Sequence, residues 1–251
     1  MYEKAARAAK IGNFFLSIVA ALLIMFMLLY GGYSLWDTYR IYHNGFVDEE
    51  LLTLKPAEKE EGLDFIELRK KVPSACAWIS IDDTHIDYPV VQGKDDMEYI
   101  NKNVYGDYSV SGAIFLSCLN HADVSDPYNL VYGHNMKNGA MFGDVVKFAN
   151  QKYFSSHKTG TLYLPDKTYN IKLFACLRVN ASDAMIYNPE SYGEDVDPLL
   201  NYIKENALQY RKQNVGTKEK VIALSTCAES ETNGRIVLFG TLEKENEKTE
   251  K

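Results

Sequence analysis

The sequence has one long uncharged stretch close to its N-terminus. No Asp, Glu, Lys or Arg occurs between Ile11 and Trp36. As an α-helix this stretch would be about 39 Å long at 1.5 Å per residue, whereas the hydrocarbon core of a bilayer is about 30 Å thick. The stretch does not end in the small residues that are typical of a signal-peptide cleavage site. It therefore predicts an uncleaved membrane anchor and excludes a plain cytosolic globule.

Charges on either side of this stretch predict its orientation. Basic residues precede it and an acidic residue follows it, namely Lys4, Arg7, Lys10 and then Asp37. By the positive-inside rule, residues 1–10 are expected in the cytoplasm, residues 11–36 in the cell membrane and the rest of the chain on the extracellular face. The whole chain carries a formal net charge of -7 and has no basic stripe, which argues against nucleic acid as a partner.

The remainder of the chain divides into three segments that differ in composition and in the spacing of their apolar residues. Residues 37–72 have apolar residues at helical spacing and predict a linker with two short helices, which Pro73 ends. Residues 73–242 contain short runs rich in β-branched and aromatic residues between turn-forming residues. The last segment, 243–251, is almost entirely charged and is expected to be disordered.

Eight strands are predicted within residues 73–242, which favours a mainly β fold closed into an eight-stranded barrel. Two helices should interrupt the barrel, one over 141–150 and one over 197–213, and the segment between Ala181 and Asp197 is a candidate lid loop. The predicted strands are Ala77–Ile81, His85–Val91, Ala113–Leu116, Asn129–Gly133, Thr161–Leu164, Thr168–Val179, Lys220–Thr226 and Arg235–Leu242.

Three of the four cysteines lie in apolar, strand-like surroundings. Cys76, Cys118 and Cys176 are therefore expected to be thiols buried in the core, where a cysteine behaves as a small hydrophobe. A disulfide between Cys118 and either of the other two is the alternative for an exported protein.

The fourth cysteine, Cys227, ends a predicted strand and is followed by turn-forming residues and a second strand. If the two strands form a hairpin centred near Glu231, Cys227 faces Arg235 across it. A neighbouring cation favours a thiolate and can donate hydrogen bonds to an oxyanion. This pairing is typical of a nucleophilic cysteine, although a plain core thiol is the alternative.

A nucleophilic cysteine also needs a proton carrier, and histidine is the side chain suited to that role near neutral pH. Of the five histidines, His134 is the best placed, because it ends an apolar strand and precedes a loop that leads into a helix. The other four, His43, His85, His121 and His157, lie in polar or linker surroundings. The alternative for His134 is an ordinary loop imidazole.

Taken together, these segments resemble the sortases, the membrane-anchored transpeptidases of Gram-positive bacteria. The N-terminal anchor, the helical lead-in, the predicted barrel and the order His, Cys, Arg all match, and the helix over 197–213 is similar to the insert of class B sortases. Ala223 stands where the family pattern Thr-Leu-x-Thr-Cys begins with Thr. The matching motifs are Tyr132-Gly133-His134-Asn135-Met136, Gly139-Ala140-Met141-Phe142, Leu224-Ser225-Thr226-Cys227 and Arg235.

The resemblance implies a mechanism. Cys227 would attack the carbonyl after Thr in a C-terminal sorting signal and form a thioester, His134 would transfer protons, and Arg235 would stabilise the oxyanion. Tyr132, Ser225 and Thr226 are candidates for substrate contact, and the alternative for Tyr132 and Ser225 is a purely structural role in their strands. The expected partners are surface proteins with a sorting motif and an amine of a lipid-linked peptidoglycan precursor, and neither a metal nor another cofactor is expected.

Three alternatives remain at this point. A sortase that polymerises pilins would use a protein lysine as acceptor. A surface-tethered binding module would need no catalysis and would leave Cys227 in the core. A papain-like hydrolase is disfavoured because its cysteine precedes its histidine in the sequence, whereas here His134 comes first.

Overall fold

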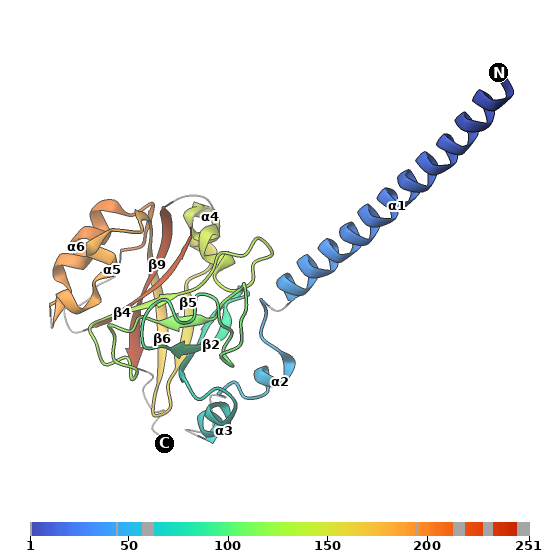
Figure 1. Ribbon diagram of the computed structural model, residues 1–251. Coiled ribbons are helices and arrows are strands. Elements are labelled where there is room, and N and C mark those ends of the chain that lie inside the picture. Colours follow the sequence, from blue (N-terminus) through green and yellow to red (C-terminus); the bar gives the residue numbers. More distant parts are fainter. Residues whose placement is uncertain are drawn as a thin grey trace. The chain divides into compact units, whose positions relative to one another are not determined.

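The computed structural model describes residues 2–43, 45–56, 63–193, 195–212, 219–227 and 233–244. The chain divides into two units, Met1–His43 and Asn44–Lys251. The first unit contains one continuous helix, α1 (Tyr2–His43), with no buried residue (Figure 1). By length and composition α1 is able to cross a membrane, and it includes the whole uncharged stretch. The candidate anchor is thus helical beyond Trp36, as far as His43.

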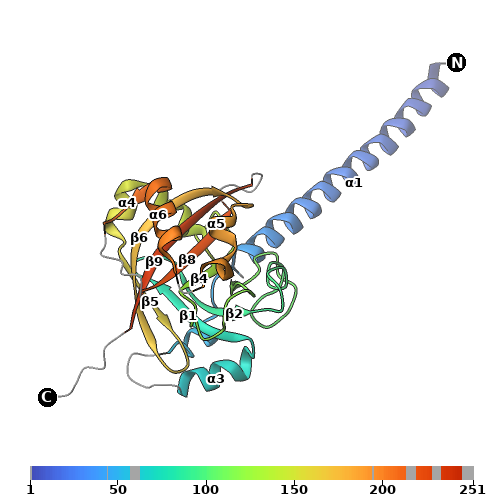
Figure 2. The ribbon, with the colours of Figure 1, turned by 90° about the vertical axis from the view of Figure 1, so that its left-hand side faces the viewer.

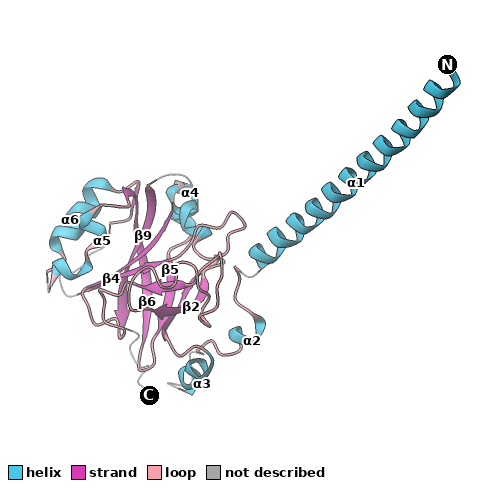
Figure 3. Cartoon of the chain, viewed as in Figure 1, coloured by secondary structure: helices cyan, strands magenta, loops and turns pink. Residues whose placement is uncertain are grey.

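The second unit is mainly β, with short helices before and between the strands (Figure 3). Its first two helices are α2 (Glu49–Leu52) and α3 (Leu63–Lys71), and α3 ends in three basic residues that suit the negative end of a helix dipole. The strands are β1 (Ala75–Ile81), β2 (Asp87–Gln92), β3 (Ile114–Leu116), β4 (Tyr128–Tyr132), β5 (Thr159–Tyr163), β6 (Thr168–Asn180), β7 (Gln209–Tyr210), β8 (Lys220–Cys227) and β9 (Gly234–Lys244).

Eight of these strands close into a barrel. They follow the order β5-β1-β2-β3-β4-β8-β9-β6, and pairing between β6 and β5 joins the two ends of the sheet. Closure leaves no long open edge among the described strands, which is the usual way for an all-β sheet to avoid pairing with other chains. Most neighbours are antiparallel, but β2 pairs with β3, and β4 with β8, in parallel. The barrel expected from the sequence is confirmed.

All eight predicted strands overlap observed ones, and the short strand β7 was missed. It pairs with β6 at Ala175 and Cys176, on the edge where β5 no longer pairs. The helix predicted over 197–213 is therefore too long. The observed helix, α6 (Asp197–Asn206), ends at Asn206, because the chain then turns toward β6 to form β7. The backbone of Ala207 is extended, and the amide of Leu208 donates to the carbonyl of Cys176.

The predicted helix over 141–150 is also corrected. Here a 3-10 helix, η1 (Gly143–Ala149), is followed by a separate α-helix, α4 (Gln151–Ser156). Asn150 divides them because its backbone is extended and its side chain accepts hydrogen bonds from the first amides of α4. At the C-terminus, β9 extends to Lys244, so the first two residues of the predicted disordered tail form strand, and the rest lie outside the described residues.

The segment between β6 and α6, considered as a lid loop, contains two short helices, α5 (Ala184–Tyr187) and η2 (Pro189–Tyr192). Together with α6 they cover one face of β4, β6, β8 and β9 (Figure 2). Ile186, Val196, Leu199 and Ile203 are fully buried in this cluster. A second cluster joins α2 and α3 to β1, β2 and β3. Tyr132, at the end of β4, packs against both clusters.

Candidate active site

The hairpin of β8 and β9 has the register predicted from the sequence. The Cα of Cys227 lies opposite that of Arg235, and the pairing continues without a shift to Lys220 and Leu242. Both residues therefore occupy the same end of the sheet. The side chain of Cys227 lies outside the described part of the structure.

Parallel pairing between β4 and β8 brings His134 to this end of the sheet as well. Tyr132 is the register partner of Ser225, and the amide of Gly133 donates to the carbonyl of Ser225 at 3.1 Å. His134 and Cys227 each follow that pair by two residues: Cys227 is the last residue of β8, and His134 lies in the loop just beyond β4. The backbones of neighbouring strands such as β4 and β8 are about 4.8 Å apart. The structure therefore brings the backbones of His134, Cys227 and Arg235 together from three adjacent strand ends.

Close packing fixes the turn before His134. A Cβ atom on Gly133 would lie 2.4 Å from Cδ1 of Ile114 and 2.7 Å from the ring of Phe142, so this position accepts only glycine without a shift. The carbonyl of His134 accepts a hydrogen bond from the amide of Phe142 at 2.9 Å. The half-buried imidazole is held through Nε2, which lies 2.8 Å from the carbonyl oxygen of Ile100.

Arg235 is half-buried and lies at the start of β9. Its Nη1 donates to the carbonyl of Gly234 at 3.1 Å, and its backbone pairs with Val179 of β6 as well as with Cys227. A guanidinium carries five donors in a planar fork, a geometry that suits the binding of an anionic oxygen.

Two of the three candidate substrate contacts lie beside the strand ends. The ring of Tyr132 stacks between Phe115, at 5.1 Å, and Tyr187, at 6.2 Å. Burial, together with the nearby carboxylate of Asp96, raises the pKa of Tyr132 and keeps the phenol neutral. The hydroxyl of Ser225 is 3.0 Å from that of Tyr187, which joins β8 to α5.

Thr226, the third candidate contact, is in a different position. It is as buried as Ser225, at 2% exposed, but as the next residue along β8 it faces the other side of the sheet. Its hydroxyl oxygen has no hydrogen-bond partner among the described residues. The structure therefore does not bring Thr226 together with Tyr132 and Ser225.

Tyr187 and Ile100 are the residues near the site that the sequence did not indicate. Tyr187 lies in the segment considered as a lid loop, and its contacts with Tyr132 and Ser225 depend on how α5 folds back over the sheet. Ile100 acts through its main-chain carbonyl, which leaves no trace in the side-chain pattern.

The other cysteines do not take part in this arrangement. Cys76, Cys118 and Cys176 are free, so neither alternative disulfide forms. Cys76 and Cys176 are buried as predicted, and burial raises the pKa of each to about 12. Cys118 is half-buried, which corrects the expectation of a core thiol. Burial and the neighbouring Asp96 also raise the pKa of Cys118.

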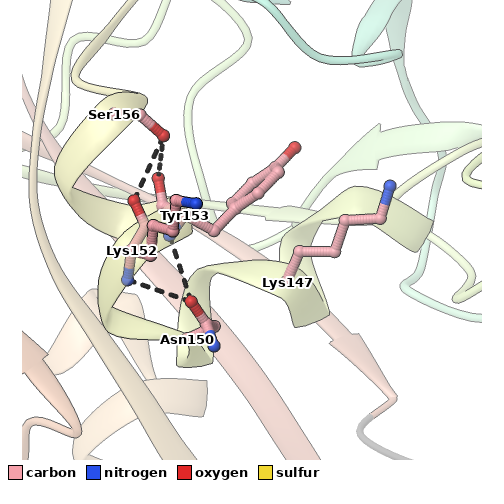
Figure 4. A pocket seen from close by; sticks show the side chains of 5 residues that line it. All are labelled: Lys147, Asn150, Lys152, Tyr153 and Ser156. Atoms are coloured by element: carbon pink, nitrogen blue, oxygen red, sulfur yellow. Dashed lines mark hydrogen bonds between the residues drawn. The ribbon is translucent and has the colours of Figure 1, made fainter.

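An open hollow of about 400 Å³ lies elsewhere, along η1 and α4 (Figure 4). Its polar groups already serve the local structure, because Asn150 caps α4 and Lys147 pairs with Asp144 at 2.7 Å. Within the described ranges, no group of three or more His, Cys, Asp or Glu side chains is arranged to hold a metal ion.

Comparison with known proteins identifies the class to which this fold and site belong. The family model of the sortase domain matches residues 79–243, and the chain belongs to the sortase family. It is a cysteine transpeptidase that most resembles the class B sortases.

Three relatives illustrate the similarity. Sortase B of Staphylococcus aureus is 25% identical over 236 residues, which are 91% of this chain and 96% of the relative. A Streptococcus pyogenes class B sortase involved in pilus biogenesis is 36% identical, with a TM-score of 0.66 over 73% of this chain and 100% of the other. Sortase B of Clostridium perfringens is 31% identical, with a TM-score of 0.64 over 71% of this chain and 99% of the other.

Proposed function

We propose that this enzyme cleaves a C-terminal sorting signal after Thr and transfers the protein to an amine of a lipid-linked peptidoglycan precursor. The observation that carries the proposal is the register at the strand ends, which sets Cys227 opposite Arg235 and beside the strand that leads into His134. A cysteine, a histidine and an arginine on adjacent strand ends supply a nucleophile, a proton carrier and an oxyanion donor.

The reaction proceeds in two acyl transfers. The sulfur of Cys227 attacks the carbonyl carbon of the Thr residue, and Arg235 donates hydrogen bonds to the oxyanion that forms. His134 carries the thiol proton to the leaving amine as the C–N bond breaks, which leaves a thioester. In the second step His134 takes a proton from the incoming amine, which attacks the thioester, and the proton returns to the sulfur of Cys227.

Tyr132 is proposed to line the peptide's path beside Cys227, and the buried Ser225 to support that path through its hydrogen bond to Tyr187. Tyr187 stacks on Tyr132 and hydrogen-bonds to Ser225, so it links the helical insert to both β4 and β8. Thr226 is proposed to support β8 from its other face, because its side chain is buried there.

The nucleophile is tested by trapping the thioester. The full-length enzyme in detergent micelles is incubated with a Thr-containing sorting peptide and examined by intact-protein mass spectrometry. The peptide adduct is expected on the wild type and on Cys118→Ala, a matched control that removes a different, half-buried thiol of the barrel unit, and not on Cys227→Ala. An adduct on Cys227→Ala would refute the assignment.

The role of Arg235 is tested by Arg235→Lys, which keeps the charge and removes the planar fork. Loss of an oxyanion donor typically lowers kcat by about a hundredfold or more. Wild-type kcat in Arg235→Lys would show that the fork is unnecessary.

A second acceptor has one observation in its favour. The Streptococcus pyogenes relative, at 36% identity, is involved in pilus biogenesis. For this chain the corresponding candidate reaction joins a pilin subunit to a lysine amine of the next one. The trapped thioester is offered equal concentrations of a peptidoglycan-precursor amine and a pilin-like lysine peptide, and the masses of the products identify the preferred acceptor. A non-catalytic binding module has no such support, since the family is one of transpeptidases.

The proposed location is the cell membrane, with α1 as a single span, the N-terminus in the cytoplasm and the barrel on the extracellular face. Support comes from the apolar helix and from the basic residues before its uncharged part. Protease added to intact protoplasts should digest an epitope at the C-terminus and leave one at the N-terminus intact. The reverse pattern would contradict this orientation.

A further inference from the structure

The imidazole of His134 is held by a main-chain group from a distant loop. Its Nε2 lies 2.8 Å from the carbonyl oxygen of Ile100, in the segment 93–113 that connects β2 to β3. A carbonyl oxygen only accepts hydrogen bonds, so Nε2 must carry the hydrogen. The other ring nitrogen, Nδ1, is then the one that takes up and releases a proton.

The carbonyl of Ile100 is fixed by its neighbours on both sides. On one side, the carbonyl of Tyr99 accepts from the amide of Ala113 at 3.1 Å, and the hydroxyl of Tyr99 donates to Ser74 at 2.7 Å. On the other side, the carbonyl of Asn101 accepts from the amide of Ser109 at 3.0 Å. The acceptor for His134 is thus anchored to the start of β1 and across the base of its own loop.

Gly112 completes this arrangement by leaving space where both partners meet. A Cβ atom there would lie 2.5 Å from the carbonyl oxygen of Ile100, 2.8 Å from that of Tyr99 and 3.0 Å from Cδ2 of His134. Gly112 also has a φ of 61°, in the left-handed region that favours glycine. Any larger residue must push the carbonyl, the imidazole or both away from their present positions.

We propose that Gly112 and the main-chain carbonyl of Ile100 are positioning groups, which hold His134 as the Nε2–H tautomer and present Nδ1 as its catalytic nitrogen. This inference rests on the proposed role of His134. It adds which nitrogen transfers the proton and what selects it. When Nδ1 accepts the thiol proton, the imidazolium keeps its Nε2–H bond to Ile100, and the same proton leaves from Nδ1 to the departing amine.

The tautomer is measured directly on the full-length protein in micelles, with ¹⁵N-labelled histidine. His134→Gln identifies the signal of His134 among the five histidines. At a pH where the ring is neutral, we expect nitrogen shifts and couplings that place the hydrogen on Nε2. A wild-type ring that carries its hydrogen on Nδ1 would overturn the proposal, and this measurement does not depend on whether Gly112→Ala folds.

Gly112→Ala tests the positioning, with Gly106→Ala as its matched control. Gly106 lies in the same loop with a φ of 89°, but a Cβ there would meet nothing within 4 Å, so its replacement introduces similar backbone strain without the collision. Because a misplacement of about 1 Å can cost about a hundredfold in rate, Gly112→Ala should lower kcat by roughly that factor with little change in KM. Gly106→Ala should keep wild-type kcat. In Gly112→Ala the His134 signal should also move toward a mixture of tautomers.

The result separates this inference from the proposed function. If His134→Ala is inactive while Gly112→Ala matches Gly106→Ala in kcat and tautomer, the positioning role is refuted and the catalytic role stands. If His134→Ala turns over peptide at the wild-type rate, the proposed function itself fails, whatever tautomer is observed.

Discussion

The hydrogen bond between Tyr187 and Ser225 predicts a measurable coupling between the helical insert and β8. The two hydroxyl oxygens are 3.0 Å apart, Ser225 is 2% exposed, and Tyr187 is half-buried. Tyr187→Phe would leave the serine hydroxyl without this partner, in a place that water does not reach. An unsatisfied buried hydroxyl costs about 1–3 kcal/mol, so we expect a loss of roughly 2 kcal/mol in the free energy of unfolding.

The reverse change should cost less. Ser225→Ala leaves the hydroxyl of Tyr187 on a half-buried side chain that water can still reach, so a loss of about 0.5–1.5 kcal/mol is expected. In the double variant both hydroxyls are absent, and its loss should be smaller than the sum of the two single losses by about 1 kcal/mol. Urea unfolding of the four full-length proteins, followed by near-UV circular dichroism, gives all four free energies.

The outcome that contradicts this reasoning is additivity. If the losses of the two single variants sum to that of the double variant within about 0.3 kcal/mol, the hydroxyls do not interact in solution. Tyr202→Phe is a useful control, because it removes another hydroxyl of the same insert, one that bonds to Asp183 and not to Ser225, so it should couple to Ser225 less than Tyr187→Phe does.

Three further predictions follow from burial and charge. Gly133→Ala should lower Tm, because the new methyl group would lie 2.7 Å from Phe142 and such overpacking costs about 1–3 kcal/mol; an unchanged Tm in a thermal melt would contradict the packing. Burial raises the pKa of Asp144, but hydrogen bonds from its neighbours outweigh this and the net pKa is lowered. Its carboxylate should therefore stabilise the fold above about pH 4 and lose that effect as the pH falls through the folded pKa, so the stability of Asp144→Asn should depend less on pH below about pH 4 in acid titrations. Cys76 and Cys176 should resist iodoacetamide in the folded protein and react in denaturant, since burial raises both pKa values to about 12; mass spectrometry that found either one alkylated in the native state would show that the core opens.

The sequence was most informative where short-range rules apply. Strand alternation and turn-forming residues gave the eight barrel strands, and the hairpin centre near Glu231 gave the pairing of Cys227 with Arg235. Within an antiparallel hairpin one turn determines every partner, so a local signal sufficed.

Long-range contacts explain what the sequence did not predict. The apolar spacing that suggests a helix over 197–213 continues past Asn206, but hydrogen bonds to β6 extend the chain instead. The same limit applies to Tyr187 and to the carbonyl of Ile100, whose roles depend on how distant segments fold back. Thr226 was grouped with Ser225 because the two are adjacent in the motif. On a strand, adjacent side chains face opposite sides of the sheet, so the side chain of Thr226 points away from that of Ser225.

The parallel pairing of β4 with β8 also bears on when activity can arise. His134 and Cys227 are about ninety residues apart in the sequence, and β8 gains its second neighbour only when β9, the last of the described strands, has joined it. A chain emerging N-terminus first carries its histidine long before its cysteine, and Arg235 arrives later still. If these residues have the roles proposed above, a nascent or truncated chain that lacks β9 should hold an unreactive thiol, and the reactive centre would be completed only once β9 has been made and has paired.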